Sequence, residues 1–193
     1  MAIAIVCVKM VRTTDARVKA IETAERLFCT QGYAATGLSQ LIEESGSPKG
    51  SFYFHFPGGK RELALEVIAA YRARTTKLFQ AIADAAQGQK FVVALANALA
   101  TEMAKSGWQK GCVAQVLSQE LAPSDTEAAD GLAALFDDWT SVSAKALGGP
   151  RPRERALALI AALEGARTLS RVTRSDAPFK AVVHQFRPPN KPS

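Results

Sequence analysis

The sequence predicts an all-α fold of about nine helices. Alanine and leucine are plentiful, whereas β-branched and aromatic residues are not, and this bias favours helix. Apolar residues recur at helical spacing along most of the chain, without sustained strand-like alternation. A hydrophobic content of 48% also supports a packed core and argues against disorder.

Three helices are expected at the front of the chain. Thr13 or Thr14 can cap the first, and Gly32 can end it in the left-handed conformation. Gly46 breaks the second, and Pro48 suits the start of the third because a first-turn N–H has no intrahelical partner. These helices are expected over residues 13–31, 37–46 and 47–56.

Longer helices are expected behind them. Gly88, Pro123 and the glycine pair after residue 147 separate the periodic segments. Ser124 or Asp125 is a suitable N-cap for the helix that follows Pro123. The expected ranges are 60–86, 90–107, 111–122, 124–149, 151–173 and 177–186.

Composition narrows the classes of function. A net charge of +6 and a pI near 9.4 fit an anionic partner such as nucleic acid, with the two ends basic and the middle acidic. The three cysteines, Cys7, Cys29 and Cys112, form no CxxC pair, which favours a reducing compartment. With two histidines and no cofactor loop, we expect no metal, no cofactor and no enzyme activity. The apolar start "MAIAIVCV" is too short to span a bilayer, so we expect a cytoplasmic protein without a membrane partner.

The second and third helices, joined by a turn at Gly46, have the form of a helix-turn-helix, in which the second helix enters the DNA major groove. Side chains at its start can meet phosphates and bases, and Gly50 allows close backbone approach. A P-loop is excluded by the missing GxxxxGK[ST] pattern, whereas a plain helical hairpin stays open. The expected DNA-binding residues are Thr36, Ser39, Lys49, Gly50, Ser51, Tyr53 and His55.

The run "AERLFCTQGYAATGLSQLIEESGSPKGSFYFHFPGGKRELALEVI" resembles the DNA-binding domain of TetR-family transcriptional regulators. Further along, "GCVAQVLSQE" and "AALEGARTLSR" are similar to the LmrA/YxaF-like branch of that family. The resemblance implies that Thr36 and Lys60 meet phosphate and that Lys49 to Ser51 start the recognition helix. Gly37 and the Ser47-Pro48 pair depart from the family's usual residues, which puts sequence specificity in doubt.

The resemblance also implies a domain plan. It comprises a lead-in over residues 1–12, disordered or loosely packed, and a helix-turn-helix domain over 13–60. A helical ligand-binding and dimerisation domain over 61–187 and a disordered tail over 188–193 complete it. The implied protein is a homodimeric repressor that leaves a palindromic, double-stranded operator when it binds a small, largely apolar effector.

Two sets of residues follow for the second domain. The expected ligand-binding residues are Phe79, Leu99, Met103, Trp108, Cys112, Val116, Phe136, Trp139 and Glu164. The expected dimer interface holds Leu157, Ile160, Ala161, Leu163, Ala166 and Leu169. For any one of these residues, an ordinary core position is the competing interpretation. For the whole chain, the competing function is a helical small-molecule carrier that does not act on DNA.

Overall fold

The computed structural model describes residues 2–187, and it describes side chains from residue 15 onward. No strand occurs in this range, which confirms the all-α prediction. The elements are α1 (Ala2–Gln31), α2 (Leu38–Glu44), α3 (Lys49–His55), α4 (Gly59–Ala85), α5 (Gln89–Lys105), α6 (Val113–Glu120), the 3₁₀ turn η1 (Ala122–Ser124), α7 (Thr126–Leu147), α8 (Pro152–Thr173) and α9 (Ala177–Gln185).

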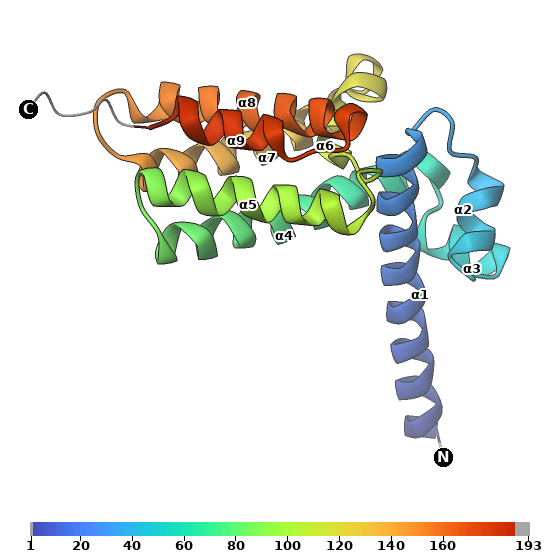
Figure 1. Ribbon diagram of the computed structural model, residues 1–193. Coiled ribbons are helices and arrows are strands. Elements are labelled where there is room, and N and C mark those ends of the chain that lie inside the picture. The colour runs from blue at the N-terminus through green and yellow to red at the C-terminus, as the bar shows by residue number, and fades with distance from the viewer. Residues whose placement is uncertain (1, 188–193) are drawn as a thin grey trace, which may run out of the picture.

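The first helix is longer than expected. We predicted a disordered or loosely packed lead-in over residues 1–12, and in the structure residues 2–12 belong to α1, which begins at Ala2. Neither glycine nor proline interrupts residues 2–31, so nothing in the sequence stops the helix from extending to the front of the chain. In Figure 1 the first half of α1 projects away from the rest of the protein. The predicted tail over 188–193 lies outside the described residues.

The first three helices form a small unit around phenylalanine side chains. Phe52 and Phe56 lie four residues apart at the inward side of α3, and each is only 1% exposed. They pack with the buried Phe28 and Leu41 in the core. Burial of one such ring stabilises a fold by roughly 2–3 kcal/mol, enough to hold a helix as short as α3 in place. Gly32, at φ +94°, then turns the chain out of α1 as predicted.

The remaining helices form a bundle beside this unit, and α7 packs against both α4 and α8 (Figure 1). Trp139 of α7 lies near its centre, stacked on Phe79 of α4 with ring centroids 5.0 Å apart. Its indole N–H donates to the hydroxyl of Thr75 at 3.0 Å, so the one polar atom of the ring is satisfied. The N-cap prediction for Asp125 is confirmed, because its carboxylate accepts from the N–H of Ala128 at 3.1 Å.

Polar contacts join the two units along the C-terminal half of α1. Arg74 of α4 donates from both terminal guanidinium nitrogens to the carboxylate of Glu25, at 2.7 and 2.8 Å. Arg171 of α8 donates to the carbonyl oxygen of Thr30 at 2.8 Å. The unit of α1, α2 and α3 is therefore joined to the bundle by charged groups as well as by packing. None of the helices within residues 2–187 combines the length and apolar character needed to cross a membrane.

Candidate nucleic-acid interface and ligand site

The outer side of α3 is open to solvent. Lys49 and Gly50 are exposed, Ser51 is half-buried, and Tyr53 is 40% exposed. A Cβ added to Gly50 would meet no atom within 4 Å, so the backbone of the first turn can be approached closely. The predicted residues of this helix are therefore available as a group, because Phe52 and Phe56 take up its other side.

Phe54 was not among the predicted contacts, although it is the most exposed aromatic residue of α3, at 76%. The signal was present in the sequence: Phe52 and Phe56 share one face, and a residue midway between them points to the opposite face. An exposed apolar side chain on a recognition helix can contact the methyl group of thymine. His55, by contrast, is half-buried, and its Nε2 has no hydrogen-bond partner among the described residues.

The structure separates three other predicted contacts. Ser39 is exposed on α2. Thr36 is fully buried, and its hydroxyl donates to the carbonyl oxygen of Gly32 at 2.6 Å. Lys60 donates to the carbonyl oxygens of Tyr33 and Thr36, both at 2.9 Å. In this structure Thr36 and Lys60 hold the turn between α1 and α2: the Thr36 hydroxyl donates within that turn, and two of the three N–H donors of Lys60 are engaged by carbonyl oxygens.

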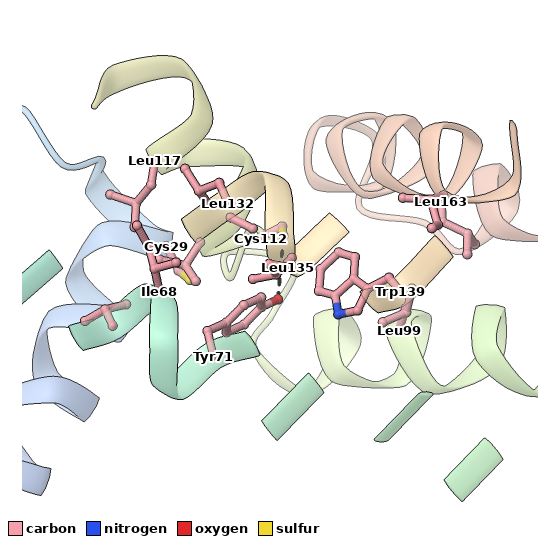
Figure 2. Close-up of a cluster of buried hydrophobic side chains, with 14 of the residues drawn as sticks. Cys29, Ile68, Tyr71, Leu99, Cys112, Leu117, Leu132, Leu135, Trp139 and Leu163 are labelled. Carbon is pink, nitrogen blue, oxygen red and sulfur yellow. Dashed lines mark hydrogen bonds between the residues drawn. The ribbon is translucent and has the colours of Figure 1, made fainter. Parts of the chain in front are cut away.

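An inner cavity of about 20 Å³ lies among α4, α5, α7 and α8. Four of the predicted ligand-binding residues line it, namely Phe79, Leu99, Trp139 and Glu164. Figure 2 shows Trp139, Leu99 and Leu163 grouped on one side of this region and Tyr71 with Cys112 on the other. The space is about that of one water molecule, so an effector enters it only if the side chains move apart.

An outer cleft of about 330 Å³ lies between the end of α1, α6 and α8. Cys112 and Val116, two more of the predicted residues, line it. The remaining three, Met103, Trp108 and Phe136, line neither hollow: Met103 is buried in the core, and Phe136 packs edge-on against Trp139. The cleft is of the size that small molecules occupy in proteins.

Arg167 lines both hollows and is the most informative residue that the predicted set omits. It is 5% exposed, and its Nε has no hydrogen-bond partner in the described part of the chain. The nearest carboxylates belong to Glu164, at 3.6 Å, and Glu102, at 3.9 Å, both beyond hydrogen-bonding distance. Its position was readable from the sequence, since Leu163 and Ser170 lie one turn away on the same helical face.

Burial sets the titration of the groups around Arg167. It raises the pKa of the Glu164 carboxyl, and the nearby guanidinium of Arg167 only partly offsets this rise. It also raises the pKa of the Cys112 thiol to about 12. The Sγ of Cys112 lies 3.5 Å from the hydroxyl of Tyr71, which points toward it in Figure 2. This cysteine is held as a neutral thiol rather than as a reactive thiolate.

The predicted dimer residues divide between two faces of α8. Leu157, Ala161 and Leu169 are exposed, and they share one side of the helix with Val172, which is 80% exposed. The other three predicted residues, Ile160, Leu163 and Ala166, are buried in the core of the same chain. These three turn toward the bundle because residues at i, i+3 and i+6 share a face, whereas the exposed set follows a row four residues apart. The position of the dimer interface on α8 stays a prediction.

Comparison with protein families gives two matches. Residues 20–67 match the model described as bacterial regulatory proteins, tetR family. Residues 89–185 match the C-terminal domain of LmrA/YxaF-like transcriptional regulators.

Individual transcriptional regulators are also similar to this chain. The chain is 31% identical to the HTH-type transcriptional regulator LmrA of Bacillus subtilis, over 86% of this chain and 91% of LmrA. It is 35% identical to the HTH-type regulator YxaF of the same organism, over 69% and 70% of the two chains. Among solved structures, a TetR regulatory protein from Rhodobacter sphaeroides superposes with a TM-score of 0.80 at 22% identity, covering 89% of this chain and 96% of that one. The reduced form of NemR from Escherichia coli superposes with a TM-score of 0.78 at 19% identity, covering 89% of this chain and 95% of NemR.

Proposed function

Because the chain belongs to the TetR family of DNA-binding transcriptional regulators, we propose that it is a cytoplasmic homodimeric repressor released from its operator by a small, largely apolar effector. The observation that carries the DNA-binding part is the exposed face of α3. There Lys49, Gly50 and Tyr53 stand open to solvent on a helix that Phe52 and Phe56 hold from behind.

Within this proposal the residues of α3 have different tasks. Lys49 reaches a phosphate or a guanine, and the backbone at Gly50 approaches a phosphate closely. Ser51 and Tyr53 donate hydroxyl groups to the DNA backbone, as does Ser39 of α2 from the preceding helix. Phe54 makes an apolar contact with a base, so its contact depends on sequence, as does that of Lys49 where it meets a guanine.

A dimer is supported by the exposed row on α8. Leu157, Leu169 and Val172 are large apolar side chains that are 51%, 58% and 80% exposed, and Gly165 on the same side leaves room for close helix approach. Two-fold pairing would double the few base contacts that one recognition helix offers and would match a palindromic operator. A Leu169→Glu variant should therefore sediment as a monomer in analytical ultracentrifugation.

Repression and release are supported by relatives and by the hollows of the second unit. One relative at 25% identity is the HTH-type transcriptional repressor NemR of Escherichia coli. In this chain the apolar side chains of Phe79, Leu99 and Trp139 surround the inner cavity, and the larger outer cleft lies next to it. The dimer can hold its two recognition helices in more than one relative position. An effector that binds one of these conformations more tightly shifts the dimer toward it.

The test is binding of the purified protein to the DNA upstream of its own gene, followed by fluorescence anisotropy at several salt concentrations. Lys49→Ala should weaken binding and lower the slope of log affinity against log salt by about one. Lys77→Ala, an exposed lysine on α4, is the matched control and should change neither quantity. Absence of salt-dependent binding to this DNA would contradict the DNA-binding part of the proposal and would favour the helical ligand carrier.

A further inference from the structure

We propose that the outer cleft between α1, α6 and α8 is a binding site for a small organic carboxylate, with the buried guanidinium of Arg167 as its charged anchor. The inference rests on the proposed function in one respect only, namely that this carboxylate is the effector. The site itself depends only on the cleft and on the charges around it.

Arg167 is buried although one of its donor nitrogens lacks a partner in the described chain. A guanidinium carries five N–H donors and a permanent charge, and its burial without hydrogen bonds is costly. Arg167 is 5% exposed, its Nε is unpartnered among the described residues, and its two nearest carboxylates lie 3.6 and 3.9 Å away. A planar carboxylate in the cleft would supply the two parallel acceptors that the planar fork of a guanidinium binds best.

The wall of the cleft supplies further groups that suit a carboxylate ligand. Arg171 lies one helical turn after Arg167, on the same side of α8, and lines the same hollow. Thr168 and Gln115 add neutral polar groups, whose side chains now pair with each other at 3.1 Å. Val116 and Cys112 provide an apolar wall on α6, against which the carbon skeleton of a ligand can pack. One carboxylate, Glu120, also borders the cleft, but it is engaged at 2.6 Å by the backbone N–H of Ala34.

Arg171 links this site to the DNA-binding unit. In the structure Arg171 donates to the carbonyl oxygens of Thr30, at 2.8 Å, and Cys29, at 3.5 Å, in the last turn of α1. A carboxylate bound at Arg167 would attract Arg171 more strongly than two neutral carbonyl groups do. The ligand would therefore compete with the end of α1 for Arg171 and would loosen the helix that positions α2 and α3.

The experiment measures binding without DNA. Isothermal titration calorimetry on the full chain would use benzoate and hexanoate, with benzamide and hexanamide as neutral partners of the same skeleton and inorganic phosphate as a plain anion. We expect each carboxylate to bind at least about tenfold more tightly than its amide, and more tightly than phosphate. Equal binding of acid and amide, tighter binding of phosphate, or no carboxylate binding up to about 10 mM would overturn the proposal.

Variants place the site. Arg167→Gln should weaken benzoate binding at least about tenfold, whereas Arg174→Gln, an exposed arginine just after the same helix, should leave it unchanged. Should Arg167→Gln fail to fold by circular dichroism, Arg167→Lys keeps the charge but loses the fork, and it should bind benzoate several-fold more weakly than the original chain. Unchanged benzoate affinity in a folded Arg167 variant would contradict the assignment.

A separate arm measures release of operator DNA by benzoate. If the protein binds no DNA, the proposed function fails, and the calorimetry still decides whether the carboxylate site exists. If DNA binds and no carboxylate binds the protein, the regulator stands and this inference fails.

Discussion

The carboxylate of Glu120, at the end of α6, accepts a hydrogen bond of 2.6 Å from the backbone N–H of Ala34, in the turn between α1 and α2. The two residues are 86 positions apart in the chain, and they belong to different units. A charged acceptor on a main-chain N–H is a strong, directional contact. It ties the bundle directly to the segment from which the helix-turn-helix begins.

Glu120→Ala should loosen that turn without unfolding the protein. Ala34 is exposed, so water replaces the lost acceptor and the cost stays near 1–1.5 kcal/mol. Amide hydrogen exchange in residues 32–37 should then become about tenfold faster, while α8 keeps its protection. Peptide-resolved exchange by mass spectrometry measures both segments in one experiment. Unchanged exchange in residues 32–37 would show that the contact does not restrain the turn.

Gly32→Ala should disturb the same contact from the opposite side. Gly32 has φ +94°, and a Cβ at this position would lie 2.9 Å from an oxygen of Glu120. The left-handed backbone alone costs an alanine about 1–2 kcal/mol, and the Glu120 side chain must also move. Urea unfolding should show this loss, whereas Gly50→Ala, in open space within α3, should leave stability unchanged or raise it by up to about 1 kcal/mol, because alanine is the better helix former. Because both changes displace the same carboxylate, Gly32→Ala and Glu120→Ala together should cost less than the sum of the two.

Two lysines that the sequence analysis placed together on the DNA should behave differently. Lys60 donates to two carbonyl oxygens and lies 4.2 Å above the ring of Tyr33, so Lys60→Met should lower the free energy of unfolding by about 2 kcal/mol. The salt dependence of operator binding should stay unchanged in this variant. Lys49→Met should do the reverse, with a lower salt slope and little change in stability. A reduced salt slope in Lys60→Met would restore Lys60 as a phosphate contact.

The helices could be predicted because their signals are local. Gly32, Gly46 and Gly88 adopt positive φ at helix ends, and the apolar periodicity between such breaks marks each segment. The start of α1 was missed because an apolar run without glycine or proline shows no boundary, and only its continuity with the next segment makes it helical. Periodicity thus identifies helix ends that glycine or proline marks, and it fails where a helix continues without such a residue.

The candidate site was only partly predictable, for a different reason. The spacing of Phe52 and Phe56 identifies the inward side of α3, and the structure agrees. The face of α8 that Ile160 and Leu163 occupy depends on which neighbours pack against it, and the sequence pattern around them is apolar on several sides. The turn contacts of Thr36 and Lys60 join residues 24 positions apart, and no local pattern reports such a pair.

Cys112 should react slowly in the native protein. Burial raises the pKa of its thiol to about 12, so at pH 8 the thiolate fraction is roughly a thousandfold below that of a free cysteine. Alkylation by iodoacetamide at pH 8, read for each cysteine-containing peptide by mass spectrometry, should therefore be slow for Cys112 in the folded protein and normal in urea. Cys29, whose thiol pKa burial also raises to about 12, should behave in the same way. Rapid native labelling of Cys112 alone would point to a reactive, redox-active thiol.

Glu164 should make stability fall as pH rises. Burial raises the pKa of its carboxyl above the ordinary value of 4.5, more than the charge of Arg167 lowers it. The folded state therefore favours the protonated acid, and the stability it contributes is fully present below about pH 4.5 and is lost as pH rises through the raised folded value. Glu164→Gln keeps the shape of the neutral acid and cannot ionise. Its free energy of unfolding should match that of the original chain near pH 4 and should exceed it by a growing margin toward pH 8.

Urea unfolding of both proteins across pH 4–8 measures this margin, and Glu43→Gln, the same change at an exposed carboxyl on α2, is the matched control. The sign of the difference separates two opposing effects on one carboxylate. If the variant becomes progressively less stable than the original chain as pH rises, the attraction of Arg167 outweighs the cost of burying the charge, and Glu164 and Arg167 act as a true ion pair across 3.6 Å. If the margin grows as expected, the cost of burying the Glu164 charge exceeds the attraction of Arg167, and the folded state favours the protonated acid over the ion pair.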